Sequence, residues 1–151
     1  MKAQREGGFL ITKIHQLAGR IFSRKLREHN IEINPAQGRI MFVLWRNDGI
    51  SIKELAKHTA LGKSTLTSML DRLEASGYVA RVPCPGDRRT ILLKRTKKDR
   101  SYEQRYVSVS QDMTRVFYKG FSKKDIDVFE EYLRRILCNL TTHEKHLIES
   151  T

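Results

Sequence analysis

Two short helix patterns that follow each other between residues 51 and 77 constrain the fold more than any other feature of the sequence. The first begins at Ser51, a residue type that caps helices, and the second begins at Lys63 after a turn at Gly62. Apolar residues recur in both at helical spacing, so each helix has one buried side, and Gly77 marks the end of the second. Two short helices around a tight turn predict a helix-turn-helix unit.

A β-hairpin pattern follows the second helix. Residues 78–82 and 90–94 are rich in side chains that favour strands, and they flank a segment with two prolines and a glycine. We therefore expect a hairpin whose tip spans residues 83–89 and carries Arg88 and Arg89. A helix-turn-helix followed by such a hairpin predicts a winged helix-turn-helix.

Long helix patterns lie on both sides of this core, over residues 10–26, 102–117 and 126–140. The residues after Thr141 are polar and are expected to fray. The predicted fold class is therefore mainly α, with a small β-hairpin as a wing. We expect a single domain over residues 1–151, since an apolar share of 39% is enough for one core.

Three helix starts are predicted by capping boxes, in which a Ser or Asn is followed three residues later by an acid or a Gln. The pairs are Asn34 with Gln37, Ser51 with Glu54, and Ser122 with Asp125. Pro35, at the first helical position after Asn34, supports the first of these helix starts.

Positive charge is concentrated in the centre of the chain, whose formal net charge is +12. Residues 51–98 contain eleven Lys and Arg against four Asp and Glu, whereas residues 99–151 contain nine of each kind. Concentrated positive charge suits a polyanion, because each neutralised phosphate releases condensed counterions. Charge alone leaves RNA and acidic lipid open as alternatives to double-stranded DNA.

The outward side of the second short helix has the chemistry to read DNA bases. With its leucines and Met69 turned inward, the side chains left outside are Lys63, Ser64, Thr65, Thr67, Ser68 and Arg72. Small hydroxyls donate or accept at base edges in the major groove, and a Thr methyl can contact a thymine methyl. Ser and Thr can also merely solvate an exposed helix. The turn before this helix and the hairpin after it favour the reading of bases.

The hairpin tip supplies a second candidate contact with the duplex. Arg88 and Arg89 lie where a wing would run along DNA, and a narrow minor groove attracts arginine. Asp87 beside them is expected to brace the wing by orienting or restraining an arginine. The alternative is a solvated tip with a charged pair. Its position directly after the reading helix favours a contact with DNA.

The run IKELAKHTALGKSTLTSMLDRLEASGYVARVPCPGDRRTILLKRT resembles the winged-helix core of the MarR family of transcriptional regulators. The resemblance continues through INPAQGRIMFVL upstream and FYKGFSKKDIDVFEEYLRRILCNL downstream, so it covers nearly the whole chain. Each motif is weak by itself, and their order is specific.

The resemblance implies a homodimer in which helices from residues 9–33 and 97–141 intertwine, while residues 34–96 form the winged DNA-binding core. Each core would enter one half of a near-palindromic operator. The side chains that the resemblance places at the major groove are Lys63, Ser64, Thr65, Thr67 and Ser68. It further implies that Arg89 reaches the minor groove, and that the protein is a repressor relieved by a small molecule.

Two departures from the family pattern concern the ends of helices. Gly62 stands where many relatives have Asp or Ser, so the reading helix loses a side-chain cap and a possible partner for a wing arginine. Arg95, Thr96 and Asp99 stand where relatives usually have Leu, Thr and Gly, which adds charge at the junction with the long helix. Thr96 can still cap that helix.

Phe22, Phe42 and Trp45 are candidates for the lining of an effector pocket near the junction of the dimer helices with the core. Ordinary core aromatics are an equally good interpretation of these three residues.

Other chemistries find little support in the sequence. Cys84 and Cys138 share no metal-ligand or redox spacing, and Cys138 is expected to be a small core residue on the last helix. No phosphate loop, nucleophile motif or metalloprotease motif occurs, so we expect no enzyme, metal or cofactor. The lack of a signal peptide or membrane span predicts a cytoplasmic protein. A non-specific, chromatin-like binder and a transcriptional activator of the same fold remain open.

Overall fold

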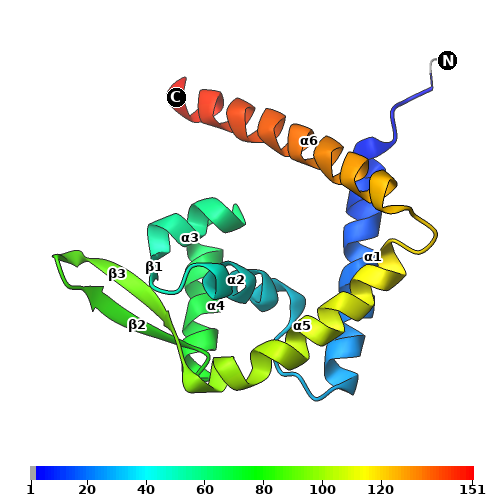
Figure 1. The fold of residues 1–151 in the computed structure, drawn as a ribbon. Helices are drawn as coiled ribbons and strands as arrows, with labels where there is room; N and C mark the ends of the chain where they lie inside the picture. The colour runs from blue at the N-terminus through cyan, green and yellow to red at the C-terminus, as the bar shows by residue number, and fades with distance from the viewer. Residues whose placement is uncertain (1–2) are drawn as a thin grey trace. The chain divides into compact units, whose positions relative to one another are not determined.

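The computed structural model describes residues 3–151 (Figure 1). The chain divides into two compact units, Met1–Met113 and Thr114–Thr151. Helix α5 (Lys97–Phe117) begins in the first unit and ends in the second. Each unit is described by itself below.

The first unit is mainly helical with a small sheet, as predicted. In chain order, its elements before α5 are α1 (Gly7–Glu28), α2 (Pro35–Arg46), β1 (Ile50–Ser51), α3 (Ile52–Thr59), α4 (Lys63–Ala75), β2 (Val79–Cys84) and β3 (Asp87–Arg95). Helices α3 and α4 are the two short helices of the predicted helix-turn-helix. The hairpin of β2 and β3 extends away from helices α2 to α4 (Figure 1), and this confirms the winged fold class.

The sheet is antiparallel throughout, in the order β1-β3-β2. Its strands run further than the sequence pattern predicts, so the tip is the short turn at Pro85 and Gly86 rather than the whole of residues 83–89. The pairing register is irregular between Pro83 and Cys84. Proline is tolerated at edge strands and bulges, and here β2 continues through Pro83.

Leucines from the helices and the sheet form the centre of the core. In α4, Leu66, Leu70 and Leu73 are at most 1% exposed, and they pack in one cluster with Leu55 of α3 and Leu93 of β3. Burial of a leucine stabilises a fold by about 1.5–3 kcal/mol. This row of leucines therefore fixes the rotation of α4, and its other side is left facing solvent.

The helix ends follow the predicted chemistry in most places. Asn34 and Gln37 form a full capping box, whereas at Ser51 only one half of the box forms, in which the Ser51 hydroxyl accepts from the Glu54 backbone N–H at 3.1 Å. Gly62 gives α4 no side-chain cap among the described residues, as the departure from the family pattern predicts. Gly77 ends α4 in the left-handed region, with φ at 83°.

The second unit contains the end of α5 and the long helix α6 (Lys123–Glu149). Ser122 and Asp125 form the predicted capping box at its start. The ring of Tyr118 packs edge-on against Phe121 and Phe129, and its hydroxyl donates to Glu130 at 3.0 Å. These contacts hold the turn between the two helices.

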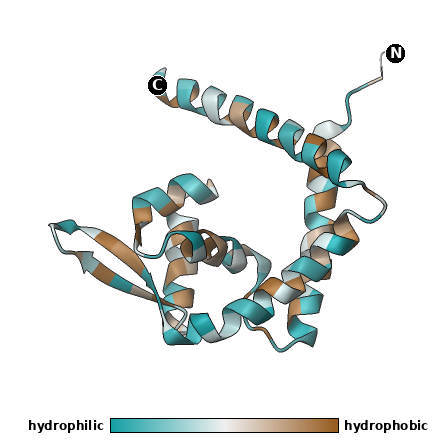
Figure 2. Cartoon of the chain, viewed as in Figure 1, coloured by the Kyte–Doolittle hydropathy of each residue, from teal (hydrophilic) through white to brown (hydrophobic). Residues whose placement is uncertain are grey.

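Two predictions for α6 are wrong. The residues after Thr141 do not fray, since the helix continues to Glu149. Cys138 is exposed rather than part of a core, and no described residue of α6 is buried. Figure 2 shows hydrophobic and hydrophilic residues alternating along α6, as in an amphipathic helix. Among residues 3–151, no helix is both long and apolar enough to cross a membrane.

Candidate nucleic-acid interface

The solvent side of α4 carries all six predicted reading residues. They are Lys63, Ser64, Thr65, Thr67, Ser68 and Arg72, and each is exposed. The buried leucines on the opposite side place them there. Between the lysine at the start of the helix and the arginine in its last turn, the exposed side chains are short, namely hydroxyls and the carboxylate of Asp71.

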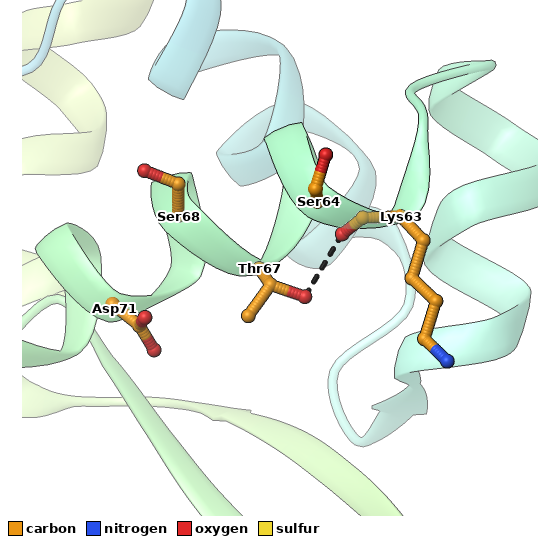
Figure 3. Close-up of a pocket in the computed structure, with 5 residues that line it drawn as sticks. All are labelled: Lys63, Ser64, Thr67, Ser68 and Asp71. Atoms are coloured by element: carbon orange, nitrogen blue, oxygen red, sulfur yellow. Dashed lines mark hydrogen bonds between the residues drawn. The ribbon is translucent and has the colours of Figure 1, made fainter.

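Part of this surface is hollowed. Lys63, Ser64, Thr67, Ser68 and Asp71 line an open depression of about 680 Å³ (Figure 3). Four of these five residues belong to the predicted set, whereas Thr65 and Arg72 lie outside this lining. The sequence interpretation missed Asp71, because an acidic residue does not fit a search for groups that bind phosphates.

The hydroxyl of Thr67 is already committed to a hydrogen bond within the helix. It donates to the backbone carbonyl of Lys63 at 2.8 Å (Figure 3). Its proton is therefore engaged, while the oxygen can still accept a hydrogen bond and the methyl group remains available for an apolar contact. Among the ways in which Thr67 could read a base pair, this geometry favours contact with a thymine methyl.

Arg81 of β2 joins the base of the wing to α4. Its guanidinium contacts Asp71 at 2.8 Å and Glu74 at 3.3 Å, and its backbone N–H donates to Glu74 at 3.3 Å. Both carboxylates are partly exposed, so the energy of each ion pair is modest. Arg81 therefore connects the base of the wing to α4. Gly62, which has no side chain, cannot bind a wing arginine in this way.

Asp87 braces the wing through the backbone rather than through an arginine side chain. Its carboxylate accepts from the Arg89 N–H at 3.0 Å and from the Thr90 hydroxyl at 2.8 Å. The bond from the Arg89 N–H, followed by that from Thr90, lowers the pKa of Asp87 from its usual value of 3.8. The side chains of Arg88 and Arg89 are exposed at this ordered turn.

The three aromatic residues proposed for an effector pocket do not share one environment. Phe22 and Trp45 both pack edge-on against Tyr106, with ring centroids 5.6 Å and 5.3 Å away. Phe42 is 49% exposed, and the Arg46 guanidinium lies 4.2 Å from its ring centroid. The structure therefore brings Phe22 and Trp45 together around Tyr106 and leaves Phe42 on the surface.

Tyr106 occupies a space that only a glycine leaves open. A Cβ atom at Gly38 would lie 1.7 Å from the Tyr106 hydroxyl oxygen, so the phenol packs directly on the backbone of α2. Burial raises the pKa of Tyr106 to about 12, against the opposing charge of Arg39. The contact fixes α5 against α2 on one side of the winged core.

Two kinds of sequence comparison agree with this geometry. Residues 33–91 match the model of the MarR family. Over 131 residues the chain is 30% identical to the multiple antibiotic resistance protein MarR of Escherichia coli, a match that covers 86% of this chain and 90% of that protein. It is also 38% identical over 82 residues to the HTH-type transcriptional regulator TtmR of Methylorubrum extorquens, but spans only 41% of the length of that relative.

Solved structures of other proteins share this fold. A mutant of Escherichia coli MarR in complex with operator DNA superposes with a TM-score of 0.78 at 28% identity, over 86% of this chain and 92% of that one. Bordetella bronchiseptica BpsR, whose DNA binding is regulated by 6-hydroxynicotinic acid, superposes with a TM-score of 0.80 at 21% identity. The match covers 90% of this chain and 97% of BpsR. At that identity BpsR shows the fold alone. Together with the exposed α4, the match to MarR over most of both sequences shows that the chain belongs to the MarR family of winged helix-turn-helix transcriptional regulators.

Proposed function

We propose that this chain is a repressor that binds a near-palindromic operator as a homodimer and is released from it by a small molecule. The observation that carries the proposal is the two-sided character of α4. Its leucines are buried, and its hydroxyl and basic side chains are all exposed on the other side. A helix packed on a core by one side, with its other side exposed, can present that side to a major groove.

The two basic ends of the surface support binding to a duplex. Lys63 begins α4, and Arg88 and Arg89 are exposed on the wing. Lysine at the helix start suits a phosphate, and the wing arginines suit the minor groove alongside. Each phosphate contact makes the affinity depend on salt, so the binding constants are to be compared at one salt concentration.

Apolar residues left exposed on α1 and α6 support the homodimer. On α1 they are Phe9, Leu10, Ile11, Ile14 and Leu17, with exposed fractions between 44% and 67%. On α6 they are Val128, Tyr132, Ile136, Leu137, Leu140, Leu147 and Ile148, between 43% and 68%. Apolar surface of this kind is unusual on a monomer and typical of an interface. A second copy of the chain is the occupant that the family membership favours.

A relative in structure and an aromatic cluster support release by an effector. BpsR has the same fold, and its DNA binding is regulated by 6-hydroxynicotinic acid, a small aromatic acid. In this chain, Phe22 and Trp45 pack against Tyr106 of α5, which itself contacts Gly38 of α2. A ligand that altered this junction would change the separation of the two reading helices, which must match half-sites about one helical turn apart.

Selection of binding sites from random duplexes tests the proposal directly. We expect an inverted repeat with half-sites about one helical turn apart. A pool without enrichment would instead support the non-specific, chromatin-like alternative, in which operator and random DNA bind equally at fixed salt. Fusion of the recovered site to a reporter then separates a repressor from an activator by the sign of the response.

A further inference from the structure

A buried cluster of charges lies where the wing meets α5. Asp99, in the first turn of α5, has no exposed surface. One of its oxygens accepts from the Arg95 guanidinium at 2.6 Å, and the other accepts from the Trp45 indole N–H at 2.7 Å. Three elements therefore meet at one carboxylate, since Arg95 ends β3 and Trp45 belongs to α2.

The side chain of Arg95 spans two turns of α5. Besides Asp99, it binds Glu103 through a second guanidinium nitrogen, and these two acids lie four residues apart on one side of the helix. A planar guanidinium with two carboxylate partners restricts rotation of the helix about its own axis. The Trp45 bond to the other oxygen of Asp99 adds a second constraint, from α2.

The backbone on both sides of this cluster is fixed as well. Asp48, after α2, accepts from the Arg95 N–H at 2.9 Å. Thr96 accepts from the Asp99 N–H at 3.2 Å, and its hydroxyl donates to the Gly77 carbonyl at 2.6 Å. The first turn of α5 is therefore capped by a residue that is itself held to the end of α4.

Stability alone is a poor explanation for such a cluster. Removing charges from water costs free energy, and the attraction between the charges often does not offset this cost. A protein with apolar residues in their place is commonly as stable. Hydrogen-bonded ion pairs differ from apolar packing in their directionality, because a planar guanidinium binds carboxylates in a fixed geometry.

We propose that Asp99 is a positioning residue for operator recognition: by holding Arg95 and Trp45, it fixes the direction in which α5 leaves the winged core and thereby the half-site spacing that the dimer accepts. This inference rests on the proposed dimeric binding to operator DNA. Asp99 itself is remote in sequence from the reading residues of α4 and acts through the elements that it joins.

Two variants loosen the cluster in different ways. Asp99→Asn keeps the size of the side chain and an oxygen for the Trp45 indole, but removes the charge opposite Arg95. Arg95→Lys keeps the charge and loses the fork that reaches both acids. The matched control is Arg24→Gln with Glu28→Gln, which removes another Arg–acid pair four residues apart, on the exposed side of α1.

Affinities are measured at fixed salt for the selected operator, for duplexes with one base pair added to or removed from the spacer, and for a single half-site. One base pair moves a half-site by about 3.4 Å along the axis. We expect the natural protein and the control to prefer one spacing by about tenfold or more. We expect Asp99→Asn and Arg95→Lys to reduce this ratio to about threefold or less, while half-site affinity changes by less than about twofold.

Two results would overturn the inference. One is a spacing preference that stays unchanged in the variants that fold. The other is an equal loss of affinity for every duplex, including the single half-site, because a merely structural role would cause such a loss. A natural protein without sequence or spacing preference would instead contradict the proposed function itself. Failure of the inference shows in the variants, whereas failure of the proposed function shows in the natural protein, so the two failures are distinguishable.

Discussion

Arg81 of β2 and Asp71 of α4 form an ion pair of 2.8 Å that ties the base of the wing to the reading helix. The same arginine also binds Glu74, one turn further along α4. In the proposed complex, wing and helix approach adjacent grooves together, so we expect their relative position to contribute to affinity. Substitution of this pair therefore tests the alignment of the wing with α4 separately from the direct contacts with DNA.

We expect Arg81→Gln to lower the free energy of unfolding by only about 0.2–1 kcal/mol, as for other partly exposed ion pairs. The loss in operator affinity should exceed this, because the wing loses its preferred orientation. Calorimetry and operator titration give the two quantities. The control is Arg24→Gln, which removes an ion pair from α1. Equal losses in stability and affinity would contradict an aligning role.

Thr67 provides a test of base reading by a methyl group. Its hydroxyl donates to the Lys63 carbonyl, so Thr67→Val, which keeps both the branch and a methyl group, should retain the base preference of the natural protein. Thr67→Ser keeps the hydroxyl but loses the methyl group, and should weaken discrimination for thymine by about 1–3 kcal/mol at one position. Site selection with both variants measures this. The reverse ranking would assign the reading to the hydroxyl.

Periodicity in the sequence predicted the surface of α4 because the spacing of Leu66, Leu70 and Leu73 leaves only one side of the helix for solvent. Caps such as Asn34 were predictable for the same local reason, since a capping box involves residues three apart. These features require no knowledge of distant parts of the chain.

Contacts between residues far apart in the sequence could not be predicted from it. The contact of Arg81 with Asp71 depends on how β2 lies against α4, and the burial of Asp99 depends on three elements meeting. A charged residue ordinarily predicts a surface position, so its burial here is a tertiary effect. The predicted effector trio is divided for a similar reason, because spacing does not reveal that Tyr106 packs against Phe22 and Trp45 while Phe42 lies on the surface.

The wing arginine gives a prediction about affinity. We expect Arg89→Ala to weaken operator binding by about 1–3 kcal/mol if its side chain makes a good groove contact. Titration of the selected operator at fixed salt measures the loss, and Lys124→Ala, in the first turn of α6, is a charge-matched control. Unchanged affinity for Arg89→Ala would remove the wing from the interface.

The hydrogen bonds of Asp87 make the conformation of the wing turn depend on pH. Because the folded protein holds the pKa of Asp87 below 3.8, the carboxylate bonds to Arg89 and Thr90 are complete at neutral pH. Their contribution is lost only as the pH falls through the lowered pKa. The amide resonance of Arg89, followed by NMR, should therefore titrate below pH 3.8. Asp87→Asn should abolish that titration, and its persistence would assign it to another acid.

Gly38 and Gly19 lie in neighbouring helices of one unit, and the same substitution should have opposite effects at the two positions. Gly38→Ala places a Cβ atom 1.7 Å from the Tyr106 hydroxyl oxygen, so the phenol must shift within the core. We expect a loss of about 1–3 kcal/mol, as for other overpacked cores. Gly19→Ala meets no described atom within 4 Å and should raise the helix stability of α1 by about 1 kcal/mol.

Denaturant unfolding measures both changes. A neutral Gly38→Ala would show that Tyr106 can leave its place on α2 without cost, and the aromatic contacts with Phe22 and Trp45 would then be too loose to fix α5. A clear loss would instead establish the contact between α2 and α5 as rigid. Since Trp45 is the sole tryptophan of the chain, its fluorescence reports on the same junction, and Gly38→Ala should shift its emission while Gly19→Ala leaves it unchanged.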